Sequence, residues 1–204
     1  MVNIISLLGL IISITIHEFS HAFAADKLGD PTPRSYGRLT LNPLAHADPI
    51  GTFLLPLFSA LFSIPTIGWA KPVPIDPYNF SHPKRDEILV ALAGPGSNFI
   101  FAVALSLLNN YIFPTPILAY LILINLSLGI FNLIPIPPLD GSKILLNLLP
   151  ADTSVEWSHA FDRYGFLLLI LLIFLPVGGS NLISFIITPF IRFFLPLLLP
   201  GSGF

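Results

Sequence analysis

Long apolar segments constrain this chain more strongly than any other feature. The first covers about residues 2–25, which is enough to cross a bilayer as a helix. Only 10% of the 204 residues are charged and 54% are hydrophobic, whereas a soluble domain needs more charge to cover its surface. We therefore expect an integral membrane protein surrounded by a lipid bilayer.

The remaining apolar segments predict the fold class. They cover about residues 50–67, 88–111, 117–135, 164–177 and 181–199. Pro56 and Pro65 interrupt segment 50–67, and the chain has 21 prolines, which favours kinked or re-entrant segments over uniform rods. We predict an all-α polytopic membrane protein with about five transmembrane helices, one re-entrant segment at 50–67 and a short membrane-associated β region at 36–41.

Basic residues predict the orientation of the chain. They follow the first and fourth segments, as Lys27, Arg34, Arg38, Lys143 and Arg163. The connectors 109–116 and 178–181 contain no Lys or Arg. Because cytoplasmic loops are richer in basic residues, we expect these two connectors and the N-terminus outside. The protein is then a multi-pass protein of the cell membrane.

Charge and cysteine content exclude several functions. The net charge is -2 and the basic residues form no dense patch, so no nucleic-acid partner is expected. The chain has no cysteine, which excludes disulfides, iron–sulfur clusters and cysteine nucleophiles. Any metal must therefore be held by His, Asp or Glu. The composition gives no oligomeric state.

The pattern His17-Glu18-Phe19-Ser20-His21 carries the strongest chemical signal. Residues four apart share one helix face, so His17 and His21 can bind one metal ion, and Glu18 can accept a proton from water at that ion. Such a short pattern can also be a solvated helix end. Here it lies in an apolar stretch, where ionisable groups are costly and usually functional. The pattern therefore favours a zinc site of the metalloprotease type.

A catalytic zinc ion has three protein ligands, and Asp140 is the best candidate for the third. It follows a long apolar segment and precedes a glycine. The alternative for an Asp-Gly pair is an Asx turn or a helix N-cap. His46, His82 and His159 are further candidates, but each lies in a polar loop, where histidines are more often solvated.

The number of membrane crossings supports Asp140. The third and fourth apolar segments cross the membrane twice. They return the chain to the side toward which His17 and His21 lie in the first segment. A full crossing by segment 50–67 would separate Asp140 from the two histidines. Lys71, Lys84 and Arg85 follow this segment, and a full crossing would place them outside. The ligand set and the basic residues therefore both favour re-entry of this segment.

Five motifs resemble one family. Besides HEFSH, they are GRLTLNPLAHADPIG at 37–51, GWAKPVP at 68–74, ALAGPGSN at 91–98 and FNLIPIPPLDG at 131–141. Their order resembles the site-2 protease family of intramembrane zinc metalloproteases (peptidase family M50). The resemblance covers residues 16–149 and includes the full pattern N-x-x-P-x-P-x-L-D-G. The chain looks like a minimal form without a PDZ or CBS domain.

The resemblance implies a zinc-dependent protease that cuts transmembrane protein substrates in or beside their membrane segments. It implies one zinc ion held by His17, His21 and Asp140, with Glu18 as the catalytic acid and base. It also implies that Asn132 lies near the active site and holds the substrate carbonyl or the oxyanion. The alternative for Asn132 is a hydrogen bond between helices.

The motifs also suggest how the chain is organised. All of them lie within residues 1–150, which we expect to form the catalytic membrane core. Residues 151–204 match no motif of the family, and we expect them to form C-terminal transmembrane helices with a gating role. Asn98 would support the ligand helices by packing and hydrogen bonding. The region 36–41 would pair with an unwound substrate strand.

Two other functions compete with the protease. A metal-binding transporter would need polar residues through several segments, and the third, fifth and sixth contain almost none that ionise. A catalytically inactive binding protein would not need Glu18, because a structural zinc site has no use for that carboxylate.

Overall fold

The computed structural model describes residues 4–55, 58, 61 and 69–200 of the chain. The membrane-type helices of this part are α1 (Ile4–Lys27), α5 (Pro83–Tyr111), α6 (Pro116–Asn132), α8 (Ala151–Phe174) and α9 (Leu182–Leu198). The shorter elements are α2 (Thr32–Ser35), α3 (Pro43–His46), η1 (Pro49–Leu54), η2 (Pro77–Asn79), α7 (Asp140–Leu148), β1 (Pro176–Val177) and β2 (Ser180–Asn181).

The protein is mostly helical, as the apolar segments predict. Three of the described helices are long and apolar enough to cross a membrane, over Leu8–Lys27, Pro83–Tyr111 and Ala151–Phe174. Two shorter apolar helices, α6 and α9, accompany them. Thr115 starts α6 by accepting a hydrogen bond from the Leu118 N–H, and Pro116 occupies the first turn, where its missing N–H costs nothing.

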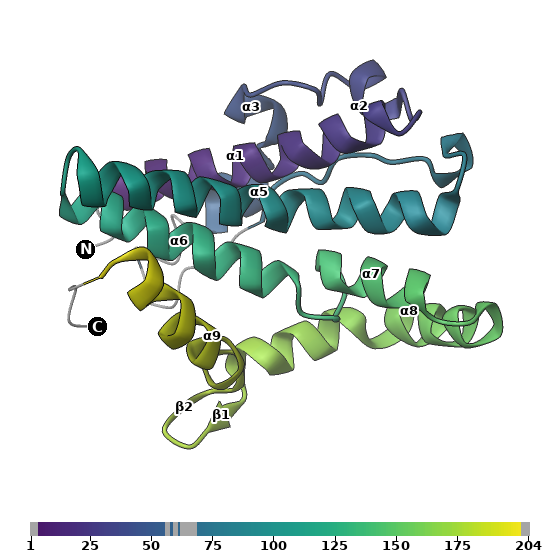
Figure 1. Ribbon diagram of the computed structural model, residues 1–204. Helices are drawn as coiled ribbons and strands as arrows, with labels where there is room; N and C mark the ends of the chain where they lie inside the picture. The colour runs from purple at the N-terminus through teal and green to yellow at the C-terminus, as the bar shows by residue number, and fades with distance from the viewer. Residues whose placement is uncertain (1–3, 56–57, 59–60, 62–68, 201–204) are drawn as a thin grey trace.

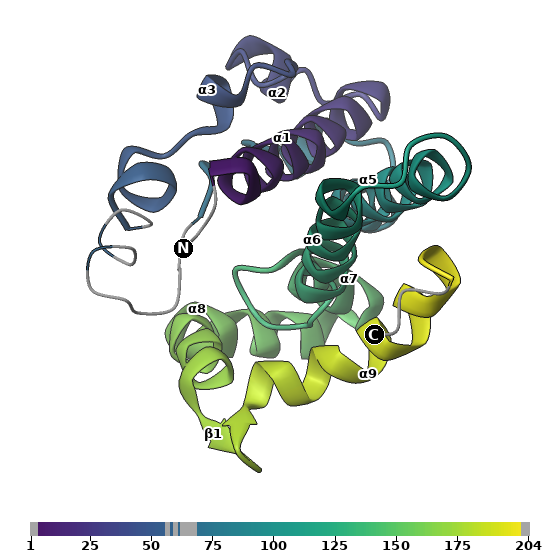
Figure 2. The ribbon, with the colours of Figure 1, turned by 90° about the vertical axis from the view of Figure 1, so that its left-hand side faces the viewer.

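Helices α1, α5 and α6 run side by side and form the centre of the molecule (Figure 1). Figure 2, turned by 90°, shows α8 and α9 together on one side of these three helices. An apolar cluster joins α5, α6 and α9, with Ile122, Leu126 and Leu195 at its centre. The short helix α7 packs against α5 and follows α6 after a non-helical turn.

The predicted β region at 36–41 is wrong. The two described strands are β1 and β2, which form a hairpin at Pro176–Asn181. Residues 36–41 instead form a turn after α2, because Gly37 adopts φ +67°, which interrupts an extended backbone. The buried guanidinium of Arg38 then donates to the backbone oxygens of Ala45 and Lys71. This loop is held by its own polar contacts rather than by a neighbouring strand.

Most of the apolar segment 50–67 lies outside the described residues, but residues 51 and 52 lie beside residue 69. Trp69 N–H donates to the Gly51 carbonyl at 3.2 Å, and Thr52 Oγ1 donates to the Trp69 carbonyl at 3.0 Å. The ends of an 18-residue helix would be about 27 Å apart. The chain therefore comes back at residue 69 to the place that it left at residue 51.

The C-terminal helices connect opposite ends of the central bundle. Lys84, near the start of α5, donates to the Leu149 carbonyl at 3.1 Å, just before α8 begins. Asn110, near the end of α5, donates to the Leu198 carbonyl at 2.9 Å, where α9 ends. Together α8 and α9 thus carry the chain along the length of α5 once.

Candidate metal centre

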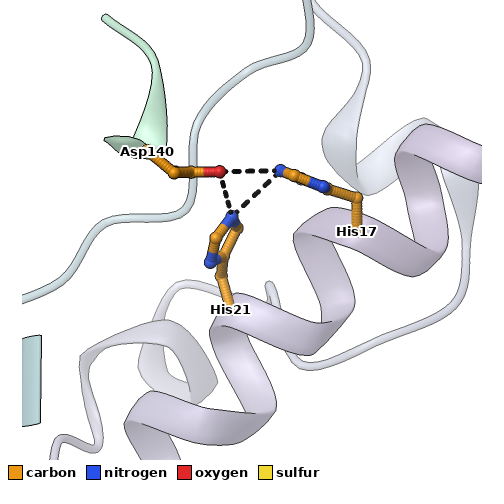
Figure 3. Close-up of side chains that lie close together, drawn as sticks. All are labelled: His17, His21 and Asp140. Carbon is orange, nitrogen blue, oxygen red and sulfur yellow. Dashed lines mark hydrogen bonds and ion pairs between the residues drawn. The ribbon is translucent and has the colours of Figure 1, made fainter. Parts of the chain in front are cut away.

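Two histidines and one aspartate converge where α1 meets α7 (Figure 3). His17 and His21 lie one turn apart on one face of α1, and their Nε2 atoms are 3.0 Å apart. Asp140 is the first residue of α7, and its Oδ2 lies 3.1 Å from His17 Nε2 and 3.2 Å from His21 Nε2. All three residues are buried. The structure thus brings together the three side chains that the sequence predicts as metal ligands.

Hydrogen bonds on the far side of each ring define its protonation. His21 Nδ1 lies 2.7 Å from the Val90 carbonyl oxygen, which can only accept, so the proton is on Nδ1. His17 Nδ1 lies 2.7 Å from Asn98 Oδ1. The Asn98 amide is oriented by its Nδ2, which donates to the Ser13 carbonyl at 3.2 Å. A neutral ring with its proton on Nδ1 presents a lone pair at Nε2, and both Nε2 atoms face Asp140.

A buried polar network extends the support of His17 into α6. Asn98 Nδ2 also donates to Asn125 Oδ1 at 3.0 Å, and Asn125 Nδ2 donates to Ser13 Oγ at 2.9 Å. Ser13 Oγ in turn donates to the Gly9 carbonyl at 2.8 Å. The side chains of Ser13, Asn98 and Asn125 are fully buried. Their orientation is thus fixed by partners on α1, α5 and α6.

The geometry of the three acceptors fits a metal ion. Two Nε2 lone pairs and one carboxylate oxygen repel one another at 3.0–3.2 Å unless a cation lies between them. A single proton could bridge only two of the three atoms. Ligands bound to zinc at about 2.1 Å in tetrahedral geometry are about 3.4 Å apart, a few tenths of an ångström more than the observed separations. Imidazole whose other nitrogen donates to an oxygen is the usual form of a metal ligand.

Glycines make room for the ligands. A Cβ atom at Gly94 of α5 would overlap His21 Nε2 and lie 2.7 Å from a carbon of the His17 ring. A Cβ atom at Gly141 would overlap the backbone oxygen of Leu133. Gly94 is therefore a steric requirement of the site, and Gly141 is a steric requirement of the turn that leads to Asp140.

The half-buried Glu18 lies beside the triangle rather than in it. Its Oε2 accepts a hydrogen bond from the Val73 N–H at 3.3 Å. Val73 belongs to an extended segment, 69–76, in which Pro72 and Pro74 favour extended backbone. This segment therefore passes directly along the face of α1 that carries Glu18.

The other predicted residues are not members of the triangle. Asn132 ends α6, and its Nδ2 donates to the Leu128 carbonyl at 3.0 Å. His46 is buried, with Nε2 2.9 Å from the Thr40 carbonyl oxygen, while His82 and His159 are exposed. Within the described residues, the metal-binding group contains none of these three histidines. The sequence interpretation missed Ser13 and Asn125, although polar residues in apolar segments are a signal that could have found them.

A carboxylate outside the membrane-type helices fixes the segment beside Glu18. Burial alone would raise the pKa of Asp30, but hydrogen bonds from Thr32, Asp76 and Asn79 outweigh it and lower the pKa below its ordinary value. The N–H groups of Thr32 and Asp76 lie 3.0 and 2.9 Å from its oxygens, and Asn79 Nδ2 lies at 2.8 Å. Asp30 thereby ties the end of α1 to the end of the extended segment.

Known proteins are similar in sequence to this chain over most of its length. A model of peptidase family M50 matches residues 112–175, which include Asp140. YwhC of Bacillus subtilis (strain 168) is 38% identical, over 83% of this chain and 80% of that protein. Rip2 of Mycolicibacterium smegmatis is 34% identical, over 86% and 68%. Both are named provisionally as zinc metalloproteases. No solved structure matches the chain significantly.

Apolar helices that converge on two imidazoles and one carboxylate define a membrane protein with a candidate metal centre. The chain belongs to peptidase family M50, the site-2 protease family. This membership confirms the resemblance that the five sequence motifs carry.

Proposed function

We propose that this chain is an intramembrane zinc metalloprotease, which hydrolyses peptide bonds in or beside the transmembrane segments of other membrane proteins. The observation that carries the proposal is the convergence of His17, His21 and Asp140, at 3.0–3.2 Å, in the interior of an apolar bundle. Two imidazoles and a carboxylate suit one zinc ion and leave a fourth position open. The relatives named as zinc metalloproteases support the same metal.

Glu18 is the proposed catalytic acid and base. When bound, zinc polarises a carbonyl oxygen and lowers the pKa of water. Glu18 follows His17 directly, and its one described hydrogen bond, from Val73, leaves lone pairs free on the carboxylate. We assign to Glu18 the transfer of a proton from the attacking water to the leaving amine nitrogen.

Asn132 is the second proposed catalytic residue. It lies eight residues before Asp140, and one proton of its Nδ2 is used in the hydrogen bond to Leu128. The second proton remains for a substrate carbonyl or for the oxyanion. A carbonyl inside a helix already accepts a hydrogen bond, so the substrate must unwind locally before it reaches Asn132.

The proposal includes a topology. The meeting of Gly51 and Trp69 supports re-entry of segment 50–67 from one side. We propose that α1, α5 and α6 each cross the membrane, and that α8 and α9 together cross it once, which gives four crossings rather than about five. The basic residues then place the metal centre toward the cytoplasmic side of the cell membrane. Residues 1–150 hold every proposed site residue, and residues 151–204 are the proposed gating part.

The substitution Glu18→Gln tests the function. In purified protein with a transmembrane substrate, we expect cleavage to fall by about 100- to 10,000-fold while one zinc ion per chain is retained. The exposed Glu156→Gln on α8 is the matched control and should cleave normally. Undiminished cleavage by Glu18→Gln would contradict the mechanism. An inactive binding protein or a metal transporter would show no cleavage by the unmodified chain.

A further inference from the structure

A cavity of about 190 Å³ lies next to the candidate metal centre. Its lining residues come from the extended segment, α5 and α7, and are Val73, Ile75, Glu87, Val90, Ala91 and Lys143. The N–H of Val73 donates to Glu18, and the carbonyl of Val90 accepts from His21. Lys143 lies one turn after Asp140 on α7. The cavity therefore borders the surroundings of Glu18, His21 and Asp140.

The cavity has a buried aliphatic end and an end that is open to water and lined by charged side chains. Val90 and Ala91 are 2% and 1% exposed, and Val73 is 8% exposed, so aliphatic groups form the deep wall. Lys143 is exposed and Glu87 is half-buried, with its carboxylate accepting from Asn147 Nδ2 at 2.8 Å. A group that enters from the aqueous end therefore meets charged side chains first and aliphatic ones last.

The volume sets the size of the occupant. A cavity of about 150 Å³ can hold one benzene-sized molecule, so this cavity holds one side chain and not a stretch of peptide. Its aliphatic wall offers no described side-chain hydrogen-bond donor or acceptor at the deep end. An aliphatic side chain fits this environment better than a polar one, because a polar group would be buried there without a partner.

We infer that this cavity receives the side chain of a substrate residue that directly flanks the scissile peptide bond, and that it selects an aliphatic residue of valine-to-leucine size. The inference rests on the proposed protease function and names a specificity determinant of the same site. Ile75 is the residue that limits the size of the occupant, because it is a half-buried branched side chain on the non-helical wall.

A substrate series tests the selection. One transmembrane substrate with a mapped cleavage site is made with Ala, Val, Leu, Phe, Trp or Asp at each position that flanks the scissile bond. At one of the two positions we expect kcat/KM to fall by about tenfold or more from Leu to Ala, Trp or Asp. In Ile75→Ala the preference should move toward Phe and Trp. Ile100→Ala, at a position that is 72% exposed on α5, is the matched control and should keep the original preference.

Cross-linking tests the same contact without catalysis. Because the chain has no cysteine, Ile75→Cys in a Glu18→Gln background gives a single thiol beside the cavity. When a mild oxidant is added to accept the two electrons, a substrate with one cysteine next to the scissile bond should form a disulfide with it, and a cysteine about two helical turns away should not. Absence of a cross-link from both flanking positions in a complex that co-purifies would overturn the inference.

The outcomes separate the two levels of the argument. If the unmodified chain cleaves no member of the series, the proposed protease function fails, and the inference fails with it. If the chain cleaves all members equally well, or if Ile75→Ala changes all of them by the same factor, only the role of the cavity is overturned. A preference that moves with the residue at position 75 supports the inference.

Discussion

The metal side of the molecule and its C-terminal helices pack in different ways. Helices α1, α5, α6 and α7 bury a connected set of polar side chains, namely Ser13, His17, His21, Asn98, Asn125 and Asp140. The buried residues described in α8 and α9 are Gly165, Leu172 and Leu195. Only 11% of the most apolar stretch of α8 is buried, compared with 39% of the corresponding stretches of α1 and α5.

This difference matters because lipid changes the value of each kind of contact. Lipid tails are as apolar as leucine, so apolar contacts alone hold helices together weakly in a membrane. A buried polar network is satisfied only in one arrangement and is costly in others. The metal side should therefore have one fixed geometry, and the C-terminal helices should tolerate change.

The largest effect is expected for a ligand. Asp140→Ala removes one of the three atoms that converge at 3.0–3.2 Å, which leaves two imidazoles for the ion. We expect loss of the bound zinc and of all measurable cleavage. Zinc content by atomic emission and cleavage of a transmembrane substrate provide the measurements. Full zinc occupancy in this variant would show that Asp140 is not a ligand.

The next effect concerns the network behind His17. Asn125→Leu removes the partner that holds Asn98 Nδ2, so that the Asn98 amide can turn and change the proton position on His17. We expect zinc affinity to fall by about 10- to 100-fold, with a shift of the His17 tautomer visible by nitrogen NMR. Ser127→Ala on the same helix is the control. Unchanged affinity and tautomer would reduce Asn125 to a packing residue.

Asp30 links the metal side to the extended segment, and its removal should lower the stability of the fold rather than the binding of metal. Asp30→Ala leaves the donors of Thr32, Asp76 and Asn79 without their acceptor. We expect the free energy of unfolding to fall by about 1–3 kcal/mol, measured in detergent with the metal chelated. Arg34→Ala breaks only an exposed ion pair with Asp26 and should change stability by less than about 1 kcal/mol.

The difference in stability between the unmodified chain and Asp30→Ala should shrink as the pH falls. Because the pKa of Asp30 is lowered in the folded protein, its contribution is fully present above the unfolded pKa of about 4 and is lost as the pH falls through the folded value. The stability of the unmodified chain should therefore approach that of Asp30→Ala below about pH 4. A difference that stays constant down to pH 2 would contradict the hydrogen-bonded carboxylate.

The sequence predicted the metal side well because its chemistry follows local rules. Residues four apart on a helix must share a face, which brings His17 and His21 together, and the count of crossings selected Asp140. The network was harder to predict, because Ser13 and Asn125 meet Asn98 only through the packing of three helices. Spacing within one segment carries no information about such contacts.

The C-terminal part was predicted less well for a related reason. The apolar pattern predicted a segment at about 164–177, but Ala151–Phe174 is one continuous helix that begins in the polar residues before it. Polarity reports only whether a segment faces water, and an exposed helix can be polar on every side. The end of α9 lies beside the end of α5, where Asn110 donates to the Leu198 carbonyl. An apolar segment contains no signal for such a contact, so its packing partner could not be predicted from the sequence.

The smallest effect is expected at Gly178, in the hairpin between α8 and α9. A Cβ atom there would meet nothing within 4 Å, but the residue has φ +57°, so Gly178→Ala should cost about 1–2 kcal/mol. Gly178→Asn should recover part of that loss, because Asn tolerates this conformation. Zinc affinity should not change in either variant, whereas Gly94→Ala, whose Cβ would overlap His21, should abolish it. Melting temperature and zinc affinity, measured for each variant, test whether the hairpin is independent of the metal centre. If Gly178→Ala weakened zinc binding as Gly94→Ala does, the C-terminal helices would be coupled to the metal centre, and the two regions would not be independent.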